Sequence, residues 1–302
     1  MNTARLGLSF TGVVLFCAPQ LVFAQSAPTI PAADLVKAVI HNELSPDSPG
    51  SDVLWKYRVD KASDGKQETR QVVETKSGSL DRLLFVAGQP LAEAQARDEA
   101  GRIQRLMHDP DEQRKLEQTH QKDLEQCNAF MQMIPDAFVF EYAGQSGTLT
   151  KVTFRPNPNF RPPNREGRVL QQMGGEIWVD ARQKRLASIR GQLMNDVKFG
   201  GGLLGHLEQG GQFIVKRTEI AAGDWELTEM NVDMHGKALL FKSICVQQKE
   251  VHSNFERVSD SLTLADGANL LLQQPLVASN APSKVAPRQV AAMASATTAG
   301  TR

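Results

Sequence analysis

Short runs of alternating apolar and polar residues fill the chain from residue 174 to residue 258. A period of two is typical of strands with one face on a core. Connectors such as 180–184 and 222–224 are too short for the helical crossovers of a parallel sheet. The pattern therefore predicts an antiparallel meander, in which His235-Gly236 is a further connector. The predicted strands are 176–180, 185–193, 212–219, 225–234, 237–247 and 250–257.

The first third of the chain combines one helix with three strands. Residues 32–44 carry apolar side chains at helical spacing, and the turn-forming residues 45–50 end that helix. Alternating runs then predict three strands, at 53–60, 67–76 and 80–87. Two more strands are predicted after residue 133, at 138–142 and 149–154.

Between these strands, residues 91–133 are charged, rich in Ala, Gln and Glu, and helical in pattern. Asp109 is placed to cap a second helix that Pro110 opens. Apolar positions are sparse until Leu124, so we expect a mostly solvated helical hairpin that docks at its end. A charge run of this kind is more often a solvated face than a binding surface.

Two irregular stretches complete the domain. Residues 155–164 hold four prolines and exclude regular structure, so we expect them to run extended along the sheet. Residues 264–272 predict a last helix, and the composition of 276–302 predicts a disordered tail. The predicted fold is mainly β (α+β), with residues 25–275 as a single domain: a curved antiparallel meander or half-barrel, an N-terminal amphipathic helix and the helical-hairpin insertion.

The N-terminus has the build of a secretory signal. Arg5 precedes an apolar stretch at 6–17, and small or moderate residues at the cleavage positions in 22–24 place the cleavage site before Gln25. An uncleaved anchor is disfavoured because the apolar stretch is shorter than the ~20 residues that span a bilayer. A lipoprotein signal at Cys17 is disfavoured because Phe16 is too large. We therefore expect residues 1–24 to be removed and the product to be periplasmic or secreted, not transmembrane.

Charge and cysteine content limit the partners. The chain has 34 basic and 34 acidic residues, and removal of Arg5 leaves 33 against 34. This balance argues against nucleic-acid binding through phosphate neutralisation. In an oxidising compartment, the two remaining cysteines, Cys127 and Cys245, form either one disulfide or two buried thiols, and the thiols are the favoured prediction.

A glycine-rich segment at 199–205 contains a literal G-x-G-x-x-G. A dinucleotide site needs these glycines to open a crossover helix, which a strand of a meander cannot supply, so no nucleotide is expected. Its apolar side chains instead cap the open edge of the sheet or contact a hydrophobic ligand; the first role is favoured, and the residues concerned are Phe199, Leu203, Leu204 and Leu207.

No catalytic or metal site is evident. The six histidines lack metal-ligand spacing, no nucleophile elbow of the form G-x-S-x-G occurs, and no cofactor is expected. The aromatic residues Trp55, Tyr57, Trp178 and Trp225 alternate with polar residues along strands. Core packing is their first interpretation, and lining of an apolar cavity, for Trp178 above all, is the second.

Segments 155–160, 175–180 and 197–206 resemble those of an uncharacterised family of secreted proteins of acidobacterial type, over residues 80–275. The order of elements also resembles that of the periplasmic lipoprotein carriers and their receptors, the LolA/LolB superfamily. That resemblance implies a curved sheet around a helix, with acyl chains held in an apolar concavity. The insertion at 91–133 and the proline-rich connector depart from it, and no functional residue aligns.

The leading hypothesis is a non-enzymatic periplasmic protein that binds a lipid, a lipoprotein or another hydrophobic ligand. The alternative is a structural or protein-interaction component of the cell envelope that uses the 91–133 helices or an edge of the sheet.

Overall fold

A computed structural model describes residues 30–45, 52–63, 65–202, 205–238 and 242–273. The predicted signal peptide, the predicted tail, Leu203 and Leu204 lie outside these ranges. No helix within them has the length and apolar composition that a membrane crossing requires.

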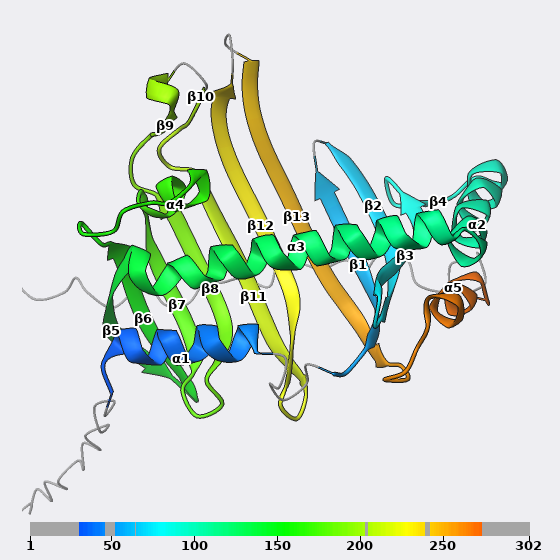
Figure 1. The fold of residues 1–302 in the computed structure, drawn as a ribbon, viewed down its shortest axis with the longest axis horizontal. Helices are drawn as coiled ribbons and strands as arrows, with labels where there is room; N and C mark the ends of the chain where they lie inside the picture. The colour runs from blue at the N-terminus through cyan, green and yellow to red at the C-terminus, as the bar shows by residue number, and fades with distance from the viewer. Residues whose placement is uncertain (1–29, 46–51, 64, 203–204, 239–241, 274–302) are drawn as a thin grey trace, which may run out of the picture. The chain divides into compact units, whose positions relative to one another are not determined.

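The chain folds mainly into one open antiparallel sheet that does not close into a barrel (Figure 1). This architecture confirms the predicted fold class. The strands follow the order β4-β3-β2-β1-β13-β12-β11-β8-β7-β6-β5, and β9 and β10 form a small extension beside β12. Because β1 pairs with β13, two meanders share one sheet. The strands are β1 Trp55–Ser63, β2 Lys66–Thr75, β3 Gly78–Val86, β4 Gln89–Pro90, β5 Phe138–Ser146, β6 Leu149–Pro156, β7 Met173–Asp180, β8 Arg185–Leu193, β9 Val197–Phe199, β10 Gly205–Leu207, β11 Gln212–Ala221, β12 Asp224–Ala238 and β13 Lys242–Arg257.

Two predicted breaks in the meander are wrong. His235-Gly236 was expected to be a connector, but both residues lie inside β12. Gly236 is needed there because a Cβ would come 2.2 Å from the carbonyl oxygen of His206, where β10 lies against β12. Gln248 and Lys249, expected to separate two strands, pair in register with Val232 and Asn231 within the continuous strand β13.

The helices are α1 Ala32–Leu44, α2 Glu93–His108, α3 Pro110–Ala137, α4 Arg165–Leu170 and α5 Leu264–Gln273. The predicted break between α2 and α3 is confirmed: Asp109 Oδ1 accepts hydrogen bonds from the backbone N–H groups of Asp111 and Glu112, and Pro110 opens α3. Helix α4 was not predicted. It begins where Asn164 caps Gly167 N at 2.8 Å, directly after the proline-rich connector.

The core consists of two clusters. The main cluster joins α1 and the C-terminal end of α3 to β5–β8, and the second cluster joins α2 and α5 to β2 and β3. The side chains of these clusters point to opposite faces of the sheet. Met234 and Phe213 pack against the main cluster and so mark its face of the sheet. Following the alternation and the strand register across β12 and β13 to β1 shows that Val59 and Tyr57 lie on this same face.

The second cluster is on the other face because its central residue, Val73, pairs with Lys56, and Lys56 points away from the side of Tyr57.

Helix α3 extends across the sheet from the β5 end to the β3 end (Figure 1). Ile134 is buried in the main cluster, and Leu116 packs against the second. Near His120, α3 passes beside the β2–β3 turn, where Gly78 adjoins the imidazole. Between these anchors, all nine residues from 121 to 129 are exposed. The middle of α3 therefore spans the sheet without packing on it.

Glycine marks close contact between strands at position 175. A Cβ there would lie 2.0 Å from the carbonyl oxygen of Arg190. Gly175→Ala should destabilise the fold by about 2–3 kcal/mol and lower the melting temperature by roughly 5–10 °C.

The control is Gly101→Ala in α2, whose new methyl group meets no heavy atom closer than 3.7 Å. This change should stabilise by about 0.5–1 kcal/mol. Similar melting temperatures for the two variants would contradict the register of β7 and β8.

Candidate functional site: a trough under helix α3

The exposed span of α3 faces the sheet with one narrow apolar stripe. Residues 116, 120, 124, 127, 131 and 134 follow one another at steps of three or four and share one side of the helix. The stripe is packed at both ends, at Leu116 and at Met131 with Ile134. Its middle residues, Leu124 and Cys127, therefore also point toward the sheet. Leu124 is nonetheless 44% exposed, so the sheet does not cover it.

The strands opposite this stripe carry apolar side chains that nothing covers completely. Phe213 packs against the main cluster, and alternation places Val215 on the same face. Met230 and Val232 pair with Val215 and Phe213 in the neighbouring strand. All four remain only half-buried. We use the name trough for the exposed residues 121–129 of α3 together with the incompletely covered face of β11, β12, β13 and β1 that the helix crosses.

Farther along the same face, the lining becomes aromatic and charged. Glu250 pairs with both Met230 and Lys61 and continues their row across β13 and β1. The ring of Tyr57 stacks on His252 at 5.2 Å and on Phe255 at 5.1 Å. The trough therefore combines an apolar middle with a polar, aromatic end.

The polar end contains carboxylates in contrasting states. Burial raises the pKa of Glu74 to about 7, although its Oε2 accepts a 3.0 Å hydrogen bond from the Trp55 backbone N–H. Burial and the nearby Glu74, Glu226 and Glu250 also raise the pKa of the Tyr57 hydroxyl. Glu250 behaves in the opposite way: His252, 3.6 Å away, and Lys61, 2.8 Å away, lower its pKa to about 2. We call the group Trp55, Tyr57, Glu74, Glu226 and Phe255 the acidic end of the trough.

An ion-pair cluster links the acidic end to α1. Glu43, at the end of α1, accepts a 2.9 Å hydrogen bond from Leu186 N and forms ion pairs with Arg185, at 3.3 Å, and with Arg217. Burial lowers the pKa of both guanidinium groups. Burial also raises the pKa of Glu226, and the same two arginines partly offset that rise.

The state of Glu74 makes stability depend on pH. Its folded pKa of about 7 exceeds the ordinary value of 4.5, so the protonated form is favoured in the folded protein. That contribution is complete below pH 4.5 and is lost as the pH rises through 7. Glu74→Gln should therefore raise the free energy of unfolding at pH 8 by about 1–3 kcal/mol and change it little at pH 5.

Melting curves of both proteins at the two pH values test this expectation. Glu250→Gln is a control that should change stability in the opposite direction. The folded protein stabilises the ionised form of Glu250, so this variant should melt at a lower temperature than the parent protein at pH 8. An equal gain for Glu74→Gln at both pH values would contradict the assignment.

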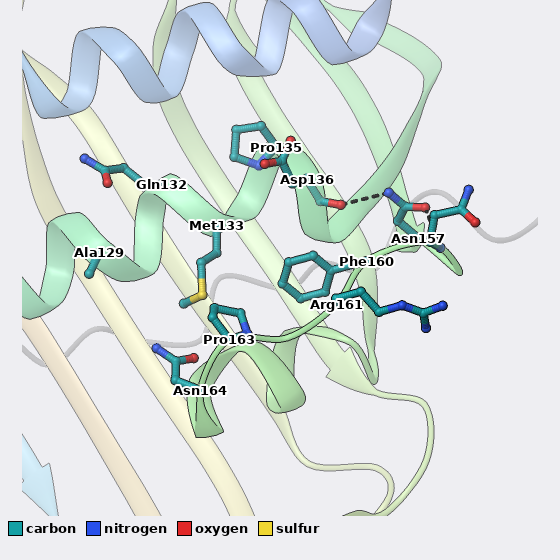
Figure 2. Close-up of a pocket in the computed structure, with 11 residues that line it drawn as sticks. Ala129, Gln132, Met133, Pro135, Asp136, Asn157, Phe160, Arg161, Pro163 and Asn164 are labelled. Atoms are coloured by element: carbon teal, nitrogen blue, oxygen red, sulfur yellow. Dashed lines mark hydrogen bonds between the residues drawn. The ribbon is translucent and has the colours of Figure 1, made fainter.

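A separate pocket of about 750 Å³ lies between the C-terminal part of α3 and the connector 157–164 (Figure 2). Asn157 Nδ2 donates to the Asp136 carbonyl at 2.8 Å, Asn157 Oδ1 accepts from Asn159 N at 3.0 Å, and Asn164 is used as the cap of α4. Phe160 is buried in the main cluster. These groups hold the connector against α3, so we interpret the pocket as a structural joint.

Three of the predicted ligand-binding residues, Phe199, Leu207 and Trp178, lie in the described part of the structure. Phe199 and Leu207 are partly buried and pack against the main cluster, while Leu203 and Leu204 lie outside the described residues. Trp178 is on the opposite face, because Ile177 and Val179 on either side of it enter the main cluster; its ring lies 5.5 Å from Lys151 Nζ. Trp178 therefore lies on a different face from Phe199 and Leu207.

The glycine segment forms a short turn at 200–202, followed by strand β10 at 205–207. Cys127 was expected to be a buried thiol, but it is an exposed free thiol on α3 because this part of the helix does not pack on the sheet. The side chain of Cys245 is outside the described part of the structure. Within the described ranges, no group of three or more His, Cys, Asp or Glu side chains is arranged to hold a metal ion.

Sequence reasoning missed the residues that line the trough. Leu124 was noted only as the start of an apolar run, although its spacing from Leu116 and Met131 marks the stripe. Glu74 stands two residues after Val72 in a strand of alternating pattern, on a face that the alternation assigns to the main-cluster side. A carboxylate at a position whose neighbours in the alternation face the core is the sequence signal that could have identified Glu74 as a site residue.

No family model and no curated protein matches this sequence. Two solved structures align at low similarity. One is a DUF1329 family protein from Desulfovibrio piger ATCC 29098, with 10% identity and a TM-score of 0.25 over 80% of this chain and 100% of the other. The second is MucB in complex with MucA(peri), with 9% identity and a TM-score of 0.21 over 74% and 94%. At these scores neither carries an argument, and the resemblance to a family of acidobacterial type gains no support.

Proposed function

We propose that this protein is a non-enzymatic periplasmic binding protein that holds the hydrophobic part of a lipid or similar amphiphile in the trough. The observation that carries the proposal is the exposure of Leu124 over half-buried apolar side chains of the sheet. The signal-like pattern at 1–24 supports the periplasmic location.

Two facing apolar surfaces with water between them gain free energy when an apolar ligand displaces that water. The gain is roughly 25 cal/mol per Å² of apolar surface buried. Leu124 and Cys127 supply one surface, and Val215, Met230 and Val232 supply the other. A chain-like ligand fits this arrangement better than a compact one, because the trough runs beneath a helix that is anchored at both ends.

Leu124→Ser tests the proposal. The lost side chain should weaken binding of a fluorescent fatty acid about fivefold to tenfold, since burying a leucine contributes roughly 1.5 kcal/mol or more. Exposed changes usually alter stability by less than about 0.5 kcal/mol, so the melting temperature should hardly change. Gln118→Ser, at an exposed position on the opposite side of α3, is the matched control and should bind like the parent protein.

Native mass spectrometry of protein purified from the periplasm provides the second measurement, with a lipid adduct as the expected result. Equal binding by Leu124→Ser and Gln118→Ser, together with the absence of any lipid adduct, would overturn the proposal.

The second candidate is a protein-interaction component of the cell envelope. It is favoured by one observation: residues 121–129 of α3 are exposed on every side and carry Lys122, Asp123 and Glu125. A partner that recognises this helix would be lost with charge reversal at these three positions and retained with Leu124→Ser. The two candidates therefore predict opposite responses to the same pair of variants.

A further inference from the structure

The acidic end of the trough holds one carboxylate without a counter-charge. Three carboxylates, those of Glu43, Glu74 and Glu226, lie near the guanidinium groups of Arg185 and Arg217 or near one another. Both arginines are ion-paired with Glu43, and both also act on Glu226. The groups that act on Glu74 are the backbone N–H of Trp55, the Tyr57 hydroxyl and Glu226, and none of them is a cation.

A buried donor points into the same place. Trp55 is only 4% exposed, and within the described part of the chain its indole Nε1 has no hydrogen-bond acceptor at normal distance. Glu226 is the carboxylate near this donor, because the indole slightly lowers its pKa, but the two groups form no hydrogen bond of normal geometry. A buried N–H without an acceptor costs roughly 1–3 kcal/mol, which a bound acceptor atom recovers.

Aromatic rings surround these groups. Trp55 meets Phe255 edge-on at 6.1 Å, and Tyr57 stacks on Phe255 at 5.1 Å. Both Glu74 and Tyr57 are half-buried, so part of each remains accessible to solvent. Carboxylates beside aromatic rings are the combination that favours an ammonium group, through charge-assisted hydrogen bonds and cation–π attraction.

We infer that the acidic end of the trough binds a primary ammonium group next to a hydrogen-bond acceptor, as the head of an amphiphile whose chain lies under α3. The inference rests on the proposed function and makes it specific. Glu74 accepts hydrogen bonds from the ammonium, Trp55 Nε1 donates to the acceptor, and Leu124 contacts the chain.

Three probes of equal chain length test the head-group preference: dodecylamine, dodecanol and dodecanoate, titrated below their micelle concentrations by calorimetry. Dodecylamine should bind about tenfold more tightly than dodecanol, and dodecanoate the most weakly. Glu74→Gln should abolish the preference for the amine and leave dodecanol binding unchanged. Glu117→Gln, at an exposed position on α3, should keep the preference.

Proton release gives an independent readout. The pKa of Glu74 is about 7 without ligand, so a bound ammonium should drive its carboxyl to ionise. At pH 6, binding of dodecylamine should release about one proton, seen as a dependence of the heat on the ionisation enthalpy of the buffer. Dodecanol should release none, and neither probe should do so with Glu74→Gln.

Equal affinity for dodecylamine and dodecanol in both proteins would overturn this inference and leave the proposed function intact. If no probe binds, and Leu124→Ser makes no difference, both fail together.

Discussion

The anchoring of α3 in two hydrophobic clusters on opposite faces of one sheet is the constraint on which the rest of the structure depends. Ile134 fixes one end of the helix over β5–β8, and Leu116 fixes the other beside α2 and α5. The unsupported part, 121–129, is about 13 Å long at 1.5 Å per residue. A helix fixed in this way cannot settle onto the strands below it without leaving one of its anchors.

An exposed helical segment of this length needs local support. Isolated helices of fewer than roughly 12–15 residues are marginal in water, so the stability of the middle of α3 comes from the packed turns on either side. Gln121 Nε2 adds a 3.1 Å hydrogen bond to Glu125 Oε1 one turn later, and the Asp109 cap fixes the first turn. At the far end, α1 is held over the same face by Glu43 and its two arginines. The charges that hold α1 thus lie next to the acidic end, where burial leaves Glu74 without a cation.

Much of the fold could be predicted from periodicity alone. The helical spacing of 32–44 and the Asp109-Pro110 break predicted the elements that the structure contains. The alternation of residues 174–258 predicted the antiparallel strands there, apart from the two wrong breaks and the short strands β9 and β10. Pairing between distant strands was not predictable in this way. No local pattern states that β1 lies beside β13, and Gly236 resembles a turn residue although its lack of a Cβ serves contact with β10. The trough depends on this pairing, because it brings Tyr57 and Glu74 beside Phe255 and Glu250, which are almost 200 residues later.

The apolar residues of the trough can be compared with the fully packed main cluster over β5–β8. Over β5–β8 the same face is filled, and Val152 and Val179 have no exposed surface. Over β11 and β12, Val215, Met230 and Val232 remain half-buried, although burying each more fully would contribute stability of roughly a kilocalorie per mole. Four apolar residues at inward positions of α3 would have closed this gap, but the helix offers only Leu124 and Cys127 and keeps them exposed. Open apolar surface is a cost to folding, and proteins retain such surface where a function needs access to it.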